Sequence, residues 1–291
     1  MMQVLVGKNA IITGASRGLG MHVARAMWQE GASLLLVARS ADALRQVHSD
    51  LMVSAQDGQR VDVVVADLQT PEAVPTIIRG ARRVWDRVDV LVNNAGILGP
   101  IGKVWENDWE EWQAAIRVNL LAPVALCRAC VWWMRERRQG KIINLSGGGA
   151  TGPRPHFSAY ATAKAGLVRF SETLAHEVRD LNVQVNCVAP GAMNTDMLQA
   201  VLQAGPKKTG TTAHTQAVKQ AETGGVPPQR AAALCVFLAS SASNGLTGKL
   251  LSAVWDPWES LLEHTDDVQD SDVYTLRRIV PRDRGRVWGV E

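Results

Sequence analysis

The chain has 291 residues, of which 46% are hydrophobic and 20% charged, enough for one large α/β domain or two small ones. Its formal net charge of +3 is too small to indicate a nucleic-acid-binding protein. The N-terminal segment carries no signal-peptide pattern, and no uncharged apolar run reaches the roughly 20 residues that cross a bilayer. These features predict a cytoplasmic protein that binds neither nucleic acid nor membrane.

Short apolar runs alternate with longer helix-like stretches, the pattern of repeated βαβ units around a parallel sheet. The predicted strands are Asn9–Thr13, Ser33–Ala38, Val61–Ala66, Val88–Asn93, Gly140–Ser146, Val183–Ala189 and Gly248–Ser252. The predicted helices are Met21–Glu30, Ala41–Ala55, Pro71–Trp85, Trp109–Arg137, Ser158–Arg179 and Pro228–Ala239. Nearly continuous Val, Ile and Leu in the strands indicates helices on both faces of the sheet. No linker separates two cores, so we predict one domain over residues 1–254 and a C-terminal extension over 255–291.

The first predicted strand runs into a glycine-rich turn, Gly14-x-x-x-Gly18-x-Gly20, and then into a helix. Glycine permits positive φ and a close approach of the backbone to a pyrophosphate, and the helix N-terminus attracts that anion. The spacing differs from the G-x-G-x-x-G dinucleotide fingerprint, and similar turns also occur without ligands. The turn is therefore a candidate dinucleotide site.

Arg39 directly follows the second predicted strand, and no carboxylate stands at this position. An acidic residue there would bind the ribose 2′-hydroxyl of NAD, whereas arginine accommodates the 2′-phosphate of NADP. Arg17, inside the glycine turn, can supply a second fork of donors to the same phosphate. Two surface arginines are the alternative interpretation. Their placement favours NADP(H) over NAD(H).

Four cysteines occur, and two of them form a lone C-x-x-C, Cys127 and Cys130, inside an apolar helical pattern. A zinc site needs a second pair of ligands at ligand spacing, and neither Cys187 nor Cys235 provides one. We predict structural thiols and no metal site.

Two segments interrupt the βα rhythm. Ala192–Val226 is rich in turn residues, and is either a disordered surface loop or, as we favour, a substrate lid. The extension is first acidic and then basic, which is typical of a solvated tail, but Trp255, Trp258 and Trp288 favour docking. We hypothesise that it covers the mouth of a pocket, its own or that of a neighbouring copy.

Tyr160 and Lys164 lie four residues apart in an apolar helix pattern, so both point to one face. A phenol has a pKa of about 10, and an ammonium about 4 Å away contributes about 4 kcal/mol at an effective dielectric near 20. We therefore expect Lys164 to lower the pKa of Tyr160. Ser146 ends a strand, outside any G-x-S-x-G elbow, where its hydroxyl can orient a substrate oxygen. His156 either reaches the same pocket or belongs to a surface loop.

These residues lie in an order that resembles the short-chain dehydrogenase/reductase family over nearly all of the segment from Lys8 to Ser252. The matching positions are Thr13-Gly14-x-x-x-Gly18-x-Gly20, Asn93-Asn94-Ala95-Gly96, Asn119, Ser146, Tyr160-x-x-x-Lys164 and Pro190-Gly191 followed by Thr195. The resemblance implies a doubly wound, Rossmann-type parallel sheet of seven strands, with the cofactor at the carboxyl ends of the strands.

The resemblance also implies roles for individual residues. Its catalytic set is Asn119, Ser146, Tyr160 and Lys164, in which Asn119 positions a water beside Lys164 and Lys164 holds the nicotinamide ribose. Its cofactor-binding set is Gly14, Ser16, Arg17, Gly18, Leu19, Gly20, Arg39, Asp67, Leu68, Asn94, Ala95, Gly96, Tyr160, Lys164, Pro190, Gly191 and Thr195. Asp67 and Leu68 are expected at the adenine and Thr195 at the nicotinamide carboxamide or phosphate, while Asn93 joins neighbouring strands.

The predicted activity is hydride transfer between NADP(H) and a carbonyl or secondary alcohol, with Tyr160 as general acid or base. The alternatives are an NAD-dependent alcohol or sugar dehydrogenase of the same family, an epimerase or dehydratase, and a catalytically silent dinucleotide sensor or scaffold. In the family, the helices that carry Asn119 and Tyr160 form a dimer interface, so we expect a homodimer or homotetramer. The chain departs from the family after its last strand, where it reads LLSAVWDPWESLL instead of an apolar strand followed by Asp-Gly-Gly.

Overall fold

The computed structural model describes residues 3–287. Within them, seven parallel strands form one sheet in the order β3-β2-β1-β4-β5-β6-β7. The strands are β1 (Asn9–Thr13), β2 (Ser33–Ala38), β3 (Val61–Val65), β4 (Val90–Asn93), β5 (Gly140–Leu145), β6 (Val183–Ala189) and β7 (Leu250–Ser252). The order reverses between β1 and β4, which is where doubly wound sheets open a crevice for a ligand. The predicted strands are confirmed, except that β3 and β5 end one residue earlier and β4 and β7 begin two residues later.

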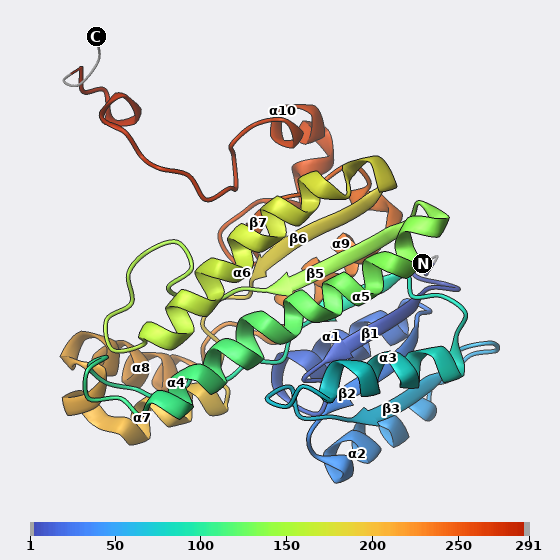
Figure 1. Ribbon diagram of the computed structural model, residues 1–291, viewed down its shortest axis with the longest axis horizontal. Coiled ribbons are helices and arrows are strands. Elements are labelled where there is room, and N and C mark those ends of the chain that lie inside the picture. The colour runs from blue at the N-terminus through green and yellow to red at the C-terminus, as the bar shows by residue number, and fades with distance from the viewer. Residues whose placement is uncertain (1–2, 288–291) are drawn as a thin grey trace.

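Helices cover both faces of this sheet (Figure 1). They are α1 (Gly18–Gln29), α2 (Ala41–Met52), α3 (Ala73–Val84), α4 (Trp109–Ile116), α5 (Ala122–Arg137), α6 (Ser158–Glu177), α7 (Asp196–Thr209), α8 (Thr211–Thr223), α9 (Pro228–Ala239) and α10 (Thr265–Gln269). One core cluster packs α1, α2 and α9 against the sheet, and a second packs α3, α5 and α6 against the opposite face. The doubly wound α/β prediction is confirmed.

The predicted helix Trp109–Arg137 is continuous but not uniform, because a π-helical turn, η1 (Arg117–Leu121), joins α4 to α5. By length and composition this run is the one candidate membrane span among the described residues, with a mean hydropathy of 1.6 in its most apolar window. About half of that window is buried inside the protein, where Leu126 and Cys127 join the second core cluster. The run is a core helix of the α/β fold.

The segment Ala192–Val226 is helical, so its interpretation as a disordered loop is wrong. Two of its glycines have positive φ: Gly205, at 70°, kinks α7, and Gly210, at 79°, separates α7 from α8. On either side of these glycines, apolar residues recur at helical spacing and are buried in one cluster with Phe157 and Tyr160. The buried side chains of the two helices are Leu198, Val201 and Ala217.

The first part of the extension docks on the fold, so a wholly solvated tail is wrong as well. Trp258 is 8% exposed and packs against Phe237 of α9. The backbone N–H of Leu250 in β7 donates to the carbonyl of Tyr274 at 2.8 Å. The buried Lys249 ammonium donates to the carbonyls of Ser271 and Val273 at 2.7 and 3.1 Å.

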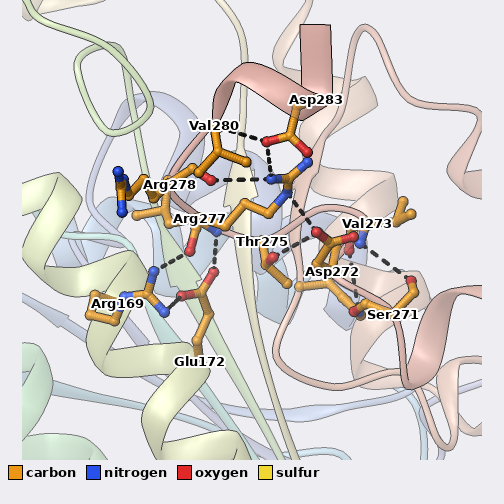
Figure 2. Close-up of polar contacts among 12 residues, drawn as sticks. Arg169, Glu172, Ser271, Asp272, Val273, Thr275, Arg277, Arg278, Val280 and Asp283 are labelled. Carbon is orange, nitrogen blue, oxygen red and sulfur yellow. Dashed lines mark hydrogen bonds and ion pairs between the residues drawn. The ribbon is translucent and has the colours of Figure 1, made fainter. Parts of the chain in front are cut away.

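Further along the extension, α6 provides the anchor (Figure 2). Glu172 accepts a hydrogen bond from the backbone N–H of Leu276 at 2.6 Å and pairs with Arg169 at 2.7 Å. From there the extension runs away from the body (Figure 1). Of the three tryptophans expected to dock, Trp255 is 85% exposed and Trp288 lies outside the described residues.

Candidate active site

The glycine turn is a close-packed backbone cradle at the end of β1. Gly14 has φ of 66°, and a Cβ atom on Gly20 would lie 2.2 Å from the Gly14 carbonyl oxygen. Asn94, which follows β4, donates from its side-chain amide to the carbonyls of Thr13 and Gly14 at 2.9 and 3.2 Å. The turn therefore requires glycine at these positions, and hydrogen bonds from Asn94 after the neighbouring strand hold it in place.

The residues expected at the adenosine end follow β2 and β3. Arg39 is exposed and faces the cavity next to Ser40, which caps α2. Arg17 points elsewhere, because its guanidinium pairs with Asp196 at the start of α7 at 2.6 Å. Asp67 accepts a hydrogen bond from the backbone N–H of Gln69 at 3.0 Å. Arg17, Arg39 and Asp67 thus line one cavity, and Arg17 is already paired across it with Asp196.

Asn93 has the structural role that the sequence suggested. Its side-chain amide donates to the Asn144 side chain at 2.8 Å, and the two residues are paired in register on β4 and β5. Both are buried. Asn93 thus joins the two central strands beside the crevice.

Asn119 lies in the π turn and is fully buried. Its side chain accepts from the N–H of Ile97 at 3.1 Å and donates to the carbonyls of Ile97 and Ala115 at 2.7 and 2.9 Å. A Cβ on Gly96 would lie 2.8 Å from Asn119 Oδ1 and 3.7 Å from Lys164 Nζ, so the two side chains flank Gly96. Asn119 therefore fixes the loop after β4 beside the lysine.

The sequence carried a signal for this irregularity that we did not use. Pro123 lies inside the predicted helix and has no N–H to donate to the Asn119 carbonyl four residues earlier. A regular α-helix is therefore interrupted at Asn119. π turns of this kind occur often at functional sites.

Tyr160 and Lys164 lie on the buried face of α6, 7% and 3% exposed. The Lys164 ammonium donates to the Leu145 carbonyl at the end of β5 at 2.7 Å and lies 5.7 Å from the centre of the Tyr160 ring. Burial lowers the pKa of Lys164 to about 8. The predicted pair is thus placed together at the carboxyl end of β5.

The expectation that Lys164 lowers the pKa of Tyr160 is wrong. Burial raises the pKa of Tyr160, and the cation that opposes the shift is Arg154, not Lys164. The Lys164 ammonium is directed to the Leu145 carbonyl, and its own charge is disfavoured by burial. Sequence reasoning missed Arg154, which lies on the β5–α6 loop with its guanidinium 5.6 Å from the Tyr160 ring centre.

Ser146 follows β5 directly and is 3% exposed. Its Oγ is buried and has no hydrogen-bond partner among the described residues. A buried hydroxyl without a partner is costly, and its position on the cavity wall marks it as a group that a ligand can satisfy.

The residues that follow β6 form the opposite wall of the cavity. Pro190, Gly191 and Thr195 line the cavity between β6 and α7, and Thr195 is the residue that precedes α7. His156 lies against the α7–α8 junction, where a Cβ on Gly210 would be 3.1 Å from its imidazole. Of the two interpretations of His156, the structure supports a pocket position.

One cavity of about 1620 Å³ connects these groups. All of the predicted site residues line it except Gly20 and Asn119, which lie behind the lining residues. Pockets for a drug-sized ligand are typically about 300–1,000 Å³. The cavity is therefore large enough for a dinucleotide together with a substrate, and its glycine cradle and unpartnered serine fit that pair.

The cysteines take no part in this site. All four are free and buried, and burial raises the pKa of Cys130, Cys187 and Cys235 to about 12. Among residues 3–287, no three His, Cys, Asp or Glu side chains gather as a metal site would require. All four thiols lie in the packed interior of the fold.

Comparison with known proteins agrees with this geometry. The chain is 33% identical to the 3-oxoacyl-(acyl-carrier-protein) reductase FabG of Chlamydia trachomatis over 87% of its length and 98% of the relative. It is 34% identical to the 3beta-hydroxysteroid dehydrogenase 1 of Eggerthella lenta, over 85% and 92% of the two chains. Among solved structures, L-sorbose reductase from Gluconobacter frateurii, complexed with NADPH and L-sorbose, superposes with a TM-score of 0.76 at 33% identity, covering 87% and 97%.

The sequence profile of the short chain dehydrogenases matches residues 8–205, which contain the glycine turn, Asn94, Asn119, Ser146, Tyr160 and Lys164. The chain therefore belongs to the short-chain dehydrogenase/reductase family of oxidoreductases.

Proposed function

We propose that this protein is an NADPH-dependent carbonyl reductase in which Tyr160 is the proton donor. The observation that carries the proposal is the placement of Tyr160, Lys164 and the unpartnered Ser146 hydroxyl on one cavity with the glycine turn. The similarity to relatives named as reductases and dehydrogenases supports this reaction class.

The residues that would hold the cofactor follow the strand ends. The pyrophosphate would lie on the glycine turn and the N-terminus of α1, with Ser16, Gly18 and Leu19 around it. Asp67 and Leu68 would contact the adenine, Asn94 to Gly96 the adjoining ribose, and Pro190, Gly191 and Thr195 the nicotinamide end. When bound, the nicotinamide supplies the hydride.

The chain's own residues would supply the proton and the orientation. The raised pKa of Tyr160 keeps the phenol protonated at neutral pH, the form that a reduction needs. Ser146 Oγ would donate a hydrogen bond to the substrate carbonyl and stabilise the charge that develops on its oxygen. Lys164 would hold the nicotinamide ribose and, with a pKa of about 8, return a proton to the tyrosinate near neutral pH. Asn119 would keep the loop at Gly96 in register with this lysine.

We propose NADPH as the preferred cofactor because Arg39 offers a cation, and Ser40 rather than a carboxylate is next to it on the cavity wall, where the adenosine ribose would lie. The sorbose reductase with NADPH supports this choice. Arg17 would contribute only after leaving Asp196.

We further propose a cytoplasmic homodimer or homotetramer with residues 1–254 as the catalytic domain and 255–291 as its extension. The run from α4 to α5 exposes large apolar side chains: Trp109 is 61%, Leu121 54% and Trp132 54% exposed. Such a surface is typical of a protein interface.

The test is NADPH oxidation with a panel of ketones, compared between the wild type and Tyr160→Phe. We expect turnover to fall by about 10²–10⁴ while NADPH binding, measured by fluorescence titration, stays within a factor of about two. Full turnover by the phenylalanine variant would refute the mechanism. Net NADPH loss also separates a reductase from an epimerase or a silent dinucleotide sensor, which consume none.

A further inference from the structure

Next to Tyr160, the cavity wall carries the guanidinium of Arg154, which has no role in the proposed mechanism. Arg154 is half-buried, and its guanidinium lies 4.2 Å from the centre of the Phe157 ring and 5.6 Å from that of Tyr160. Over residues 3–287 the guanidinium makes no hydrogen bond or ion pair; the Arg154 backbone carbonyl accepts from the Phe157 N–H. A guanidinium carries five N–H donors, so all of them remain available to a ligand in the cavity.

Two glycines show how close this guanidinium lies to the reacting centre. A Cβ on Gly147 would be 2.3 Å from the Tyr160 hydroxyl, and a Cβ on Gly148 would be 3.6 Å from Arg154 Nη1. Consecutive residues of the chain thus touch the proton donor and the cation. A small ligand can contact both at once.

The described residues do not neutralise this charge. The carboxylates on the cavity wall are those of Asp67 and Asp196. The first accepts from the Gln69 backbone beside β3, and the second pairs with Arg17. Neither of them pairs with Arg154. A partly buried cation without a counter-ion is unfavourable, and an anionic ligand would relieve that cost.

Neighbouring groups define the rest of the ligand. The Ser146 Oγ and the Nδ1 of His156 are buried and lack partners among the described residues. Ser146 and Tyr160 line the same cavity, so one carbonyl oxygen in it can be placed between the two hydroxyls. The ligand therefore needs a neutral oxygen at Ser146 and Tyr160 and an anionic group a few bonds away at Arg154.

We propose that Arg154 binds the carboxylate of a short oxo acid whose ketone oxygen lies between Tyr160 and Ser146. This assignment rests on the proposed reductase activity. Because the guanidinium lies beside the phenol, the carboxylate and the ketone are adjacent or separated by one carbon, as in 2-oxo and 3-oxo acids. A planar guanidinium binds a carboxylate through two parallel hydrogen bonds, which sets the orientation of the ketone as well as affinity.

The test separates binding from turnover by using the Tyr160→Phe variant saturated with NADPH, because it keeps the ring beneath Arg154. Calorimetric titration compares acetoacetate with its methyl ester, which lacks the negative charge and carries one added methyl group. We expect the acid to bind at least about tenfold tighter, and Arg154→Gln in the same background to abolish the difference. Arg154→Lys should recover part of it. Arg60→Gln, an exposed arginine far from the cavity, is the matched control and should change nothing.

Equal affinity for acid and ester would overturn the proposal, as would an equal loss of both in Arg154→Gln. An Arg154→Gln enzyme with intact Tyr160 whose kcat profile shifts in pH, while KM for acetoacetate is unchanged, would also overturn it, since Arg154 would then act through the phenol. Failure of the proposed function has a different signature: no NADPH binding by any variant, or full turnover by Tyr160→Phe.

Discussion

The glycine turn after β1 and the extension after β7 are both held against the sheet, but by different interactions. The turn is close-packed because side chains are missing: a Cβ on Gly20 would strike the Gly14 carbonyl. The extension is held by side chains that reach it from the fold, chiefly Lys249 and Glu172, and by its own Trp258. The turn thus has no room for a side chain at Gly14 or Gly20, whereas the extension depends on side chains that can be removed one at a time.

Truncation of the extension should have the largest effect. A chain ending at Trp255 loses the buried Trp258, Leu261 and Val268. At about 1.5–3 kcal/mol for each buried apolar side chain, the free energy of unfolding should fall by more than about 4 kcal/mol. The melting temperature should then fall by about 10 °C, measured by calorimetry.

A chain ending at Arg278 is the matched control, because it keeps the bond from the Leu276 N–H to Glu172. It should melt close to the full-length protein. Equal melting of all three chains would show that the docked extension contributes nothing to stability.

Gly20→Val tests the other side of the comparison. The added side chain must displace the Gly14 carbonyl and the Asn94 amide, which a Cβ would approach to 2.2 and 2.4 Å. We expect NADPH affinity to fall at least about a hundredfold, or about 2.8 kcal/mol, by fluorescence titration. Gly152→Ala is the control, since a Cβ there meets nothing within 4 Å. Tight NADPH binding by the valine variant would show that the cradle does not hold the dinucleotide.

The same contrast explains what the sequence could reveal. The strand, turn and helix around Gly14 and Gly20 are adjacent in the chain, so local pattern was enough to predict them, as it was for Tyr160 and Lys164 on one face of α6. The docking of the extension depends on contacts between residues far apart, such as Leu276 with Glu172, which leave no local pattern. Arg154 was missed for a similar reason, because only the fold shows that it lacks a counter-ion beside Tyr160.

Arg39→Ala should have a smaller effect, because the arginine is exposed to solvent. Losing its interaction with a 2′-phosphate should raise the Kd for NADPH about tenfold, or about 1.4 kcal/mol, and leave the Kd for NADH unchanged. Isothermal titration with both cofactors measures this. A wild type that binds NADH more tightly than NADPH would contradict the proposed cofactor preference.

Glu172→Gln should have the smallest effect on stability. The direction in which this effect changes with pH shows whether burial or the ion pair with Arg169 dominates at the carboxyl. Burial raises the pKa of Glu172 in the folded protein, against the opposing effects of the Leu276 N–H and Arg169. In the pH range above its usual value of 4.5, the folded protein therefore holds the proton more tightly than the unfolded chain. Stability contributed by this group is then lost as the pH rises through that range. Urea unfolding from pH 4 to 8 should show the wild type losing stability relative to the glutamine variant, which cannot ionise but still accepts from Leu276. The opposite trend, with the glutamine variant losing stability relative to the wild type, would mean that the ion pair with Arg169 outweighs burial and that the extension is anchored by charge.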